Sequence, residues 1–163
     1  MPRRPILLHP NPRLRACAER VVAFDADLQR LADDLIETLH ASGGIGLAAP
    51  QVGDLRRVLV MDHSGQASAP EIYVNPEVLT AAAPGWVEES CLSLPGVVGN
   101  VVRSTEIRVR AYATTGTAFE RDLAGMPAVC LQHELDHLDG KLFIDRLPIW
   151  RRWLLRARGP NAA

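Results

Sequence analysis

The residues best suited to chemistry lie between positions 130 and 140, in the stretch CLQHELDHLDG. His133 and His137 are four positions apart, and on a helix that spacing places two imidazoles on one face, where both can bind a single cation. Glu134 would lie beside the cation and could accept a proton from a water molecule that the cation activates. The H-E-x-x-H pattern also occurs by chance, so hydrogen-bonded core histidines are the alternative interpretation.

A catalytic site of this kind needs a third protein ligand. Metallopeptidases with this pattern usually take it from further along the chain, but residues 138–163 contain no histidine, glutamate or cysteine. The ligand must therefore lie upstream, where Cys91 stands in the extended segment WVEESCLSLPG, which we expect to break at Pro95-Gly96. A thiolate there can complete a Cys-His-His set and leave the fourth tetrahedral position to water. The alternative for Cys91 alone is a buried structural cysteine.

Three stretches together resemble the motifs of the peptide deformylases: GIGLAAPQ at 44–51, ESCLS at 89–93 and QHELDHLDG at 132–140. Their order and separation match that family, and the resemblance covers essentially the whole chain. The family removes the formyl group from the N-terminal formylmethionine of new bacterial and organellar proteins. The resemblance implies that the metal ligands are Cys91, His133 and His137, and that Glu134 is the general acid and base.

The resemblance also implies the groups that contact the substrate. The Gln51 side chain and the backbone N–H of Leu92 would donate hydrogen bonds to the formyl oxygen, where one such donor is typically worth about 3 kcal/mol. The methionine side chain would enter an apolar pocket formed by Ile45, Val87, Met126 and Val129, each of which could instead pack in the core. The residues expected at the substrate site are Gly44, Ile45, Gly46, Val87, Glu89, Met126 and Val129.

Two positions depart from the family pattern. Ser90 stands where the family usually has glycine before its cysteine, and serine loses the freedom to adopt positive φ. Val98 stands where several bacterial relatives carry a peptide-contacting arginine, and Arg103 comes further on. Because Cys91 is kept, we expect metal binding to persist, whereas the peptide preference stays open.

One thiolate and two imidazoles suit Zn²⁺, Fe²⁺, Ni²⁺ or Co²⁺, and affinity alone does not select among them. The resemblance implies Fe²⁺ as the native ion, with Zn²⁺ often found after purification, and formylmethionyl nascent peptides as partners. Two other interpretations remain. One is a different metal-dependent amidase or peptidase; the other is a catalytically weakened protein that binds formyl peptides or hydroxamate inhibitors.

The elements that must position these residues follow from the sequence pattern. Residues 27–40 are expected to form a helix, because apolar residues recur at helical spacing after Asp25, which can cap it, and Gly43-Gly44 ends it. Strands are expected at 57–61 and at 72–74, where Asn75-Pro76 turns the chain. The stretch EIRVRAY at 106–112 alternates apolar with charged residues and should pair with 117–123 as a hairpin.

A second helix should begin near Pro127 and end before Gly140, with His133 and His137 on a largely uncharged face. A short basic helix over residues 148–158 is expected to close the chain. The order of elements predicts one domain over residues 1–163, an α+β fold in which mostly antiparallel sheets wrap around the central helix that carries the H-E-x-x-H motif.

Composition limits the classes of function. The chain has 163 residues, 47% of them hydrophobic and 23% charged, with a net charge of −1. The net charge predicts no overall electrostatic attraction to anionic lipid or nucleic acid, and we expect no sequence-specific binding of nucleic acid. No apolar stretch approaches a membrane span, and the three cysteines form no spaced framework, which favours the cytoplasm. The arginines near the C-terminus could dock on ribosomal RNA near emerging chains, or simply face water on a docked terminal helix.

Overall fold

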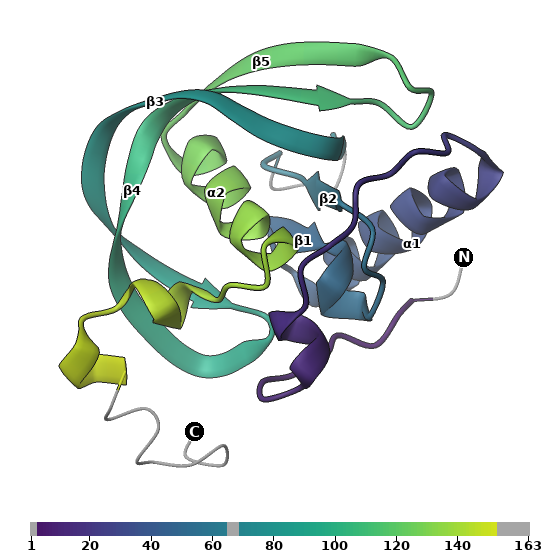
Figure 1. Cartoon of the computed structure of the whole chain (residues 1–163). Coiled ribbons are helices and arrows are strands. Elements are labelled where there is room, and N and C mark those ends of the chain that lie inside the picture. Colours follow the sequence, from purple (N-terminus) through teal and green to yellow (C-terminus); the bar gives the residue numbers. More distant parts are fainter. Residues whose placement is uncertain (1–2, 65–68, 153–163) are drawn as a thin grey trace.

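The computed structural model describes residues 3–64 and 69–152, and its strands curve around one helix, α2 (Met126–Leu138) (Figure 1). The sheet has the order β1-β2-β3-β4-β5, and each pair of neighbouring strands is antiparallel. The expected α+β architecture is confirmed. The strands are β1 (Gly46–Ala48), β2 (Val58–Met61), β3 (Glu71–Cys91), β4 (Leu94–Tyr112) and β5 (Ala118–Ala124).

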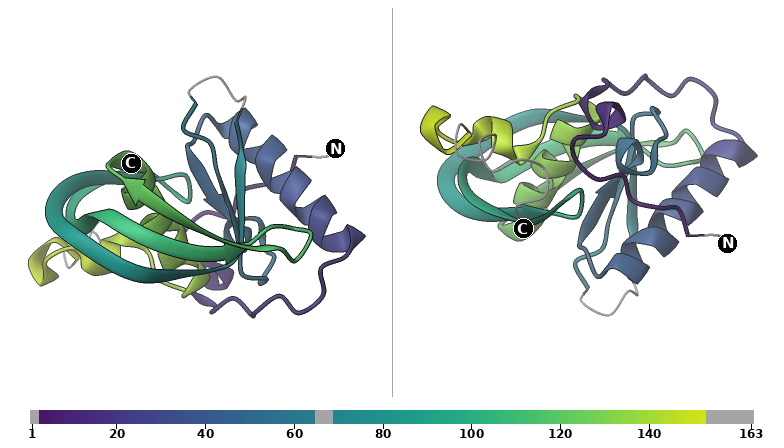
Figure 2. Two further views of the ribbon diagram at one scale, coloured as in Figure 1. Left: turned by 90° about the horizontal axis from the view of Figure 1, so that it is seen from above. Right: turned by 90° about the horizontal axis from the view of Figure 1, so that it is seen from below.

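The first helix, α1 (Ala26–Ser42), begins and ends as the sequence predicts. The Asp25 carboxylate accepts hydrogen bonds from the N–H groups of Asp27 and Leu28, and Gly43 ends the helix in the left-handed conformation with φ of 70°. The helix lies against β1 and β2, whose residues are all buried (Figure 2). The short strand β1 was not expected, since its glycine-rich sequence gives little strand signal.

Strands β3 and β4 form a long hairpin, and both are longer than predicted. The chain does not turn out of the sheet at Asn75-Pro76; instead β3 continues through a register shift between Val74 and Glu77. Asn75 has a φ of 51°, which asparagine tolerates better than most residues, and its amide exchanges two hydrogen bonds with the backbone of Val21. A bulge therefore accommodates the proline within the strand.

The turn of this hairpin also differs from the expectation. Cys91 pairs with Leu94, so the two-residue turn is Leu92-Ser93, and β4 continues through Pro95-Gly96. The strand does not end at Pro95-Gly96 as expected, but its pairing with β3 is interrupted there: Ser90 pairs with Val98 and Cys91 with Leu94, and Gly96 has a φ of 75°. Cys91 is therefore the last residue of β3 and lies directly before the turn.

The later elements agree with the prediction where the structure describes them. Strand β5 pairs with β4 from Tyr112–Ala118 onward, as expected for a hairpin across residues 113–117. Helix α2 begins after Gly125 and packs Ala128, Leu131 and Leu138 into the core. A 3-10 turn, η3 (Phe143–Arg146), follows it. Helical structure resumes at residue 149, and the rest of the predicted basic helix lies outside the described residues.

Two further 3-10 turns complete the part of the chain that the structure describes, η1 (Pro12–Arg15) and η2 (Ala49–Val52). The turn η2 contains Gln51. Within the described ranges no helix is both long and apolar enough to cross a membrane.

Candidate metal centre

The structure brings together the three predicted metal ligands. Cys91 at the end of β3 and His133 and His137 of α2 each offer one ligand atom, and these atoms all lie within 4.8 Å of one another. The Cys91 Sγ lies 3.3 Å from His137 Nε2. Two ligands on a tetrahedral cation, with bonds of about 2.3 Å to sulfur and about 2.0 Å to nitrogen, would be separated by about 3.5 Å. The donor set and its spacing therefore fit a single divalent cation.

His133 is oriented by its other ring nitrogen. Its Nδ1 donates to Glu89 Oε2 at 2.8 Å, which leaves Nε2 free to face Cys91 and His137. Metal-binding histidines commonly have such a carboxylate partner, because it fixes the tautomer and the ring orientation. The ring of Phe143 also stacks on His133, with 6.2 Å between the centroids.

The two imidazoles have opposite electrostatic surroundings in the absence of a cation. Burial, together with the positive charge of His133, lowers the pKa of His137 to about 3, so this ring is neutral and ready to coordinate. For His133, burial also lowers the pKa, but hydrogen bonds to Cys91 and Glu89 outweigh it and raise the pKa to about 10. His133 would therefore have to lose a proton before its Nε2 could bind a cation, as is usual for histidine and cysteine ligands.

Glu134 lies beside these ligands, and among the described residues its carboxyl group forms no ion pair with a basic side chain. Its side chain is buried, and burial raises its pKa to about 7. In the described part of the chain its Oε2 has no hydrogen-bond partner, which is rare for a buried oxygen and marks it as an acceptor for a bound molecule. Gly46 makes room for this carboxylate, because a Cβ there would lie 2.6 Å from Glu134 Oε1 and from the Cys130 sulfur.

Gln51 lies on the cysteine side of the centre. Its Oε1 accepts from the N–H of Ala48 at 2.8 Å, and its Nε2 donates to Ser93 Oγ at 3.2 Å. The same Nε2 is 3.8 Å from the Cys91 sulfur, so the amide donor is aimed at the centre. Leu92, the other predicted donor, occupies the adjacent turn, and a Cβ on Gly44 would lie 2.9 Å from its side chain.

The four predicted pocket residues differ in exposure. Met126 and Ile45 are exposed, at 57% and 42%, whereas Val129 is buried and Val87 is partly buried. Exposed apolar side chains are available to an apolar substrate group, but the role of these four residues as a methionine pocket stays a prediction.

The structure answers one question about Ser90. It does not have a positive φ, its strand partner is Val98, and its side chain is exposed while those of Glu89 and Cys91 on either side are buried. The backbone at this position therefore accepts an L-residue without strain. The serine side chain lies on the face of the strand opposite to the cysteine.

Glu89, a predicted substrate residue, binds His133 and Arg103, and the contact with Arg103 was not predicted from the sequence. Both oxygens of Glu89 are occupied by His133 Nδ1 and by a fork from Arg103, whose Nε and Nη2 donate at 2.6 and 3.0 Å. The Glu89 side chain thus orients the His133 ring, and its predicted contact with the substrate stays a prediction. A signal for both existed: alternation along a strand places Glu89 with Cys91, and Arg103 with the buried Val101, on inward faces.

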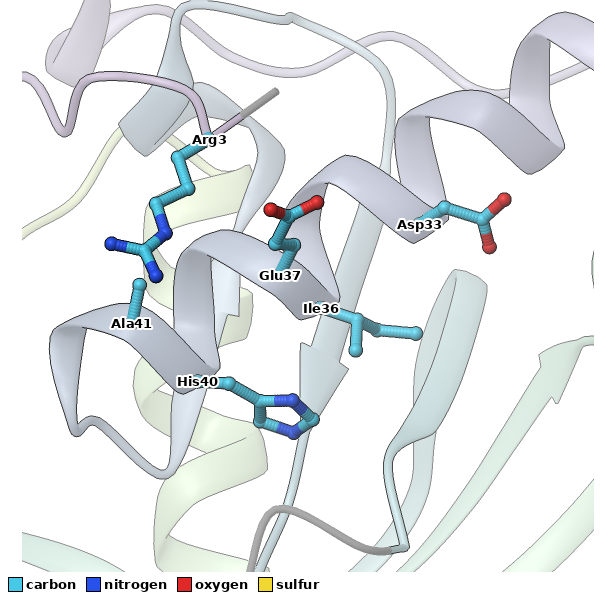
Figure 3. Close-up of a pocket in the computed structure, with 6 residues that line it drawn as sticks. All are labelled: Arg3, Asp33, Ile36, Glu37, His40 and Ala41. Atoms are coloured by element: carbon cyan, nitrogen blue, oxygen red, sulfur yellow. The ribbon is translucent and has the colours of Figure 1, made fainter. Parts of the chain in front are cut away.

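A hollow on the outer face of α1 shares no residue with this centre. It is lined by Arg3 and, along α1, by Asp33, Ile36, Glu37, His40 and Ala41 (Figure 3). His40 Nε2 is 2.9 Å from Asp62 Oδ2. We assign no function to this hollow.

A strand cysteine and two histidines from an H-E-x-x-H helix, with a buried glutamate beside them, define a metal-dependent hydrolase centre in an α+β fold. The polypeptide deformylase family matches residues 3–153, so the chain belongs to the peptide deformylase family.

Relatives and solved structures agree with this assignment. Peptide deformylases of Alkalilimnicola ehrlichii and Cellvibrio japonicus are 46% and 44% identical, each over 94% of this chain and over 86% and 92% of their own lengths. The crystal structure of a peptide deformylase from Legionella pneumophila superposes with a TM-score of 0.91 at 41% identity, covering 96% of this chain and 92% of that one. The peptide deformylase of Thermotoga maritima gives a TM-score of 0.86 at 38% identity, covering 91% and 99%.

Proposed function

We propose that this chain hydrolyses the formyl amide of N-terminal formylmethionine on newly made proteins and releases formate. The observation that carries the proposal is the meeting of Cys91, His133 and His137 within 4.8 Å, beside the buried Glu134. Bound there, a divalent cation would supply Lewis-acid chemistry and make water nucleophilic near neutral pH. The family assignment supports the substrate.

The side chains divide the remaining work. Glu134 would accept a proton as the water oxygen bonds to the formyl carbon, and would pass it to the amine nitrogen as the C–N bond breaks. Gln51 Nε2 and the Leu92 N–H would donate to the formyl oxygen as that oxygen gains negative charge. The free Oε2 of Glu134 and the aim of Gln51 toward Cys91 support these roles.

We also propose the native metal ion and the cellular location of the protein. Fe²⁺ is proposed as the native ion, since the thiolate and imidazole ligands accept it, while Zn²⁺, Ni²⁺ or Co²⁺ would also bind. A cytoplasmic location is proposed from the cysteine usage. Contact with the ribosome through the C-terminal segment stays a prediction, because residues 153–163 lie outside the described part of the chain.

The test is an anaerobic assay of formate release from a formylmethionyl peptide, with metal analysis of the same sample. We expect Glu134→Gln to keep the metal but lower kcat/KM by roughly 10²–10⁴-fold. Cys91→Ala should lose the metal, and Glu88→Gln, an exposed glutamate of the same strand as Cys91, should match the unmodified protein.

Two results would contradict the proposal. If the metal-loaded protein binds the formylated peptide or a hydroxamate without releasing formate, the chain is a binding protein. If it cleaves other acyl groups and leaves the formyl group intact, it is a different amidase.

A further inference from the structure

A row of alternating charges leads from the metal centre to the surface. Arg103, whose side chain is 1% exposed, holds Glu89 with its fork and donates its Nη1 to Asp136 Oδ2 at 2.7 Å. Asp136 then receives a second fork, from Arg146, whose Nε and Nη2 both donate at 2.6 Å. The Arg146 side chain is 42% exposed, so the row ends in solvent. Two carboxylates and two guanidinium groups balance in charge.

The segment that carries Arg146 contacts the metal helix at two points. Arg146 belongs to η3 and binds Asp136, and Phe143 of the same turn stacks on the ring of His133. His133 and Asp136 are three positions apart, so they lie on neighbouring faces of α2. The turn η3 therefore contacts α2 both at His133 and at Asp136.

We propose that Arg146 is a positioning residue for His133, acting through Asp136, Arg103 and Glu89. The inference rests on the proposed metal site. Without Arg146, the buried Asp136 would have one cationic partner, Arg103, and would draw that guanidinium toward itself. The fork on Glu89 would loosen, and with it the hydrogen bond that orients the His133 ring.

Arg146 could instead serve only to anchor η3, and the chain offers a matched control. Arg15 forms an ion pair with Asp145, which lies in the same turn and, among the described residues, has no hydrogen bond or ion pair with a side chain of the row. Arg15→Gln removes an anchor of η3 and leaves the row intact. Arg146→Gln removes an anchor and the end of the row together.

The experiment measures the rate at which an excess of chelator removes Co²⁺ from the loaded protein, with folding checked by circular dichroism. Replacing direct partners of metal-binding histidines typically costs about 10–100-fold in affinity, so Arg146→Gln, three contacts away, should speed dissociation by about 3–10-fold. Arg146→Lys keeps the charge but not the fork, so its dissociation rate should lie between those of the unmodified protein and Arg146→Gln. Arg15→Gln should dissociate at the rate of the unmodified protein.

A double-variant cycle tests whether Glu89 carries the effect. In a Glu89→Gln background, Arg146→Gln should add nothing, because the link to His133 is already broken. An unchanged or slower rate for Arg146→Gln, an equal effect of Arg15→Gln, or full additivity with Glu89→Gln would each overturn the inference. If the unmodified protein binds no Co²⁺ at all, the proposed metal site is wrong and the inference fails with it. Metal binding by the unmodified protein therefore separates failure of the metal site from failure of the role of Arg146.

Discussion

At the scale of single residues, Glu134 shows how a functional requirement opposes stability. The fold buries this carboxyl and leaves one of its oxygens without a hydrogen bond within the described residues. In the metal-free protein its pKa is raised by burial from 4.5 to about 7, so the folded state holds the proton more tightly than the unfolded chain does. Its contribution to stability is therefore fully present below pH 4.5 and is lost as the pH rises to about 7.

We predict that Glu134→Gln stabilises the metal-free protein only at the higher pH. At pH 8 the unmodified protein must hold a buried anion, and the gain in the free energy of unfolding should be about 3 kcal/mol. At pH 4 both side chains are neutral, and the gain should vanish. Urea unfolding at the two pH values, under reducing conditions, measures the difference. An equal gain at both would show that the carboxyl is not the cause, and the exposed Glu88→Gln should change neither.

The residues that carry chemistry could be predicted from the sequence, whereas their supporting partners could not. The H-E-x-x-H spacing indicates His133 and His137, whereas Cys91 follows from the absence of a further ligand in residues 138–163 and from the family resemblance. Arg103 and Asp136 were missed, because an isolated arginine or aspartate has no such signature and most of them face water. Their pairing depends on the register of β3 and β4 against α2, which sequence alone does not determine.

At the scale of elements, the helices were predicted better than the long strands. Helix α1 has a cap, a regular apolar face and a terminal glycine, and each of these signals is local. Strands β3 and β4 contain register shifts, and after each shift the inward and outward positions exchange. A search for strictly alternating apolar and polar residues therefore detects only parts of these strands. The two-residue periodicity of strands therefore does not reveal that Glu71–Cys91 is one continuous strand.

Two glycines that follow helices provide a prediction at this scale. Gly140 and Gly43 have nearly the same φ, 69° and 70°, but a Cβ on Gly140 would lie 2.5 Å from the backbone oxygen of Arg15, whereas Gly43 has nothing within 4 Å. Gly43→Ala should cost about 1 kcal/mol for the left-handed conformation alone. Gly140→Ala should cost at least about 2–3 kcal/mol, because the end of α2 must also move away from Arg15.

Urea midpoints at constant m-value measure both costs. Equal costs for the two variants would mean that the contact of Gly140 with Arg15 carries no energy. In that case the final glycine of QHELDHLDG would serve only to end the helix.

At the scale of the whole molecule, the centre joins the hairpin of β3 and β4 to helix α2, which also meet through packing and through the hydrogen bonds of Arg103 to Asp136 and of His133 to Glu89. Cys91 belongs to a core cluster with Leu94 and Val101, which lie on the arm formed by β3 and β4, and with Phe143 of η3. The two histidines belong to α2, whose Ala128, Leu131 and Leu138 are part of a different core cluster. A cation bound to all three ligands would tie the arm to the helix, and it would bind the folded state alone.

We therefore expect metal removal to lower the thermal stability of the chain. A ligand present at about 100 times its Kd stabilises the folded state by about 2.7 kcal/mol. In a domain of this size each kcal/mol shifts the Tm by about 2–4 °C, so loading with Ni²⁺ or Co²⁺ at that excess should raise the Tm by about 5–10 °C. Thermal scans of the loaded and chelated protein measure the shift. Cys91→Ala should abolish it, because two histidines of one helix do not join the helix to the arm; a full shift in that variant would place the cation away from β3.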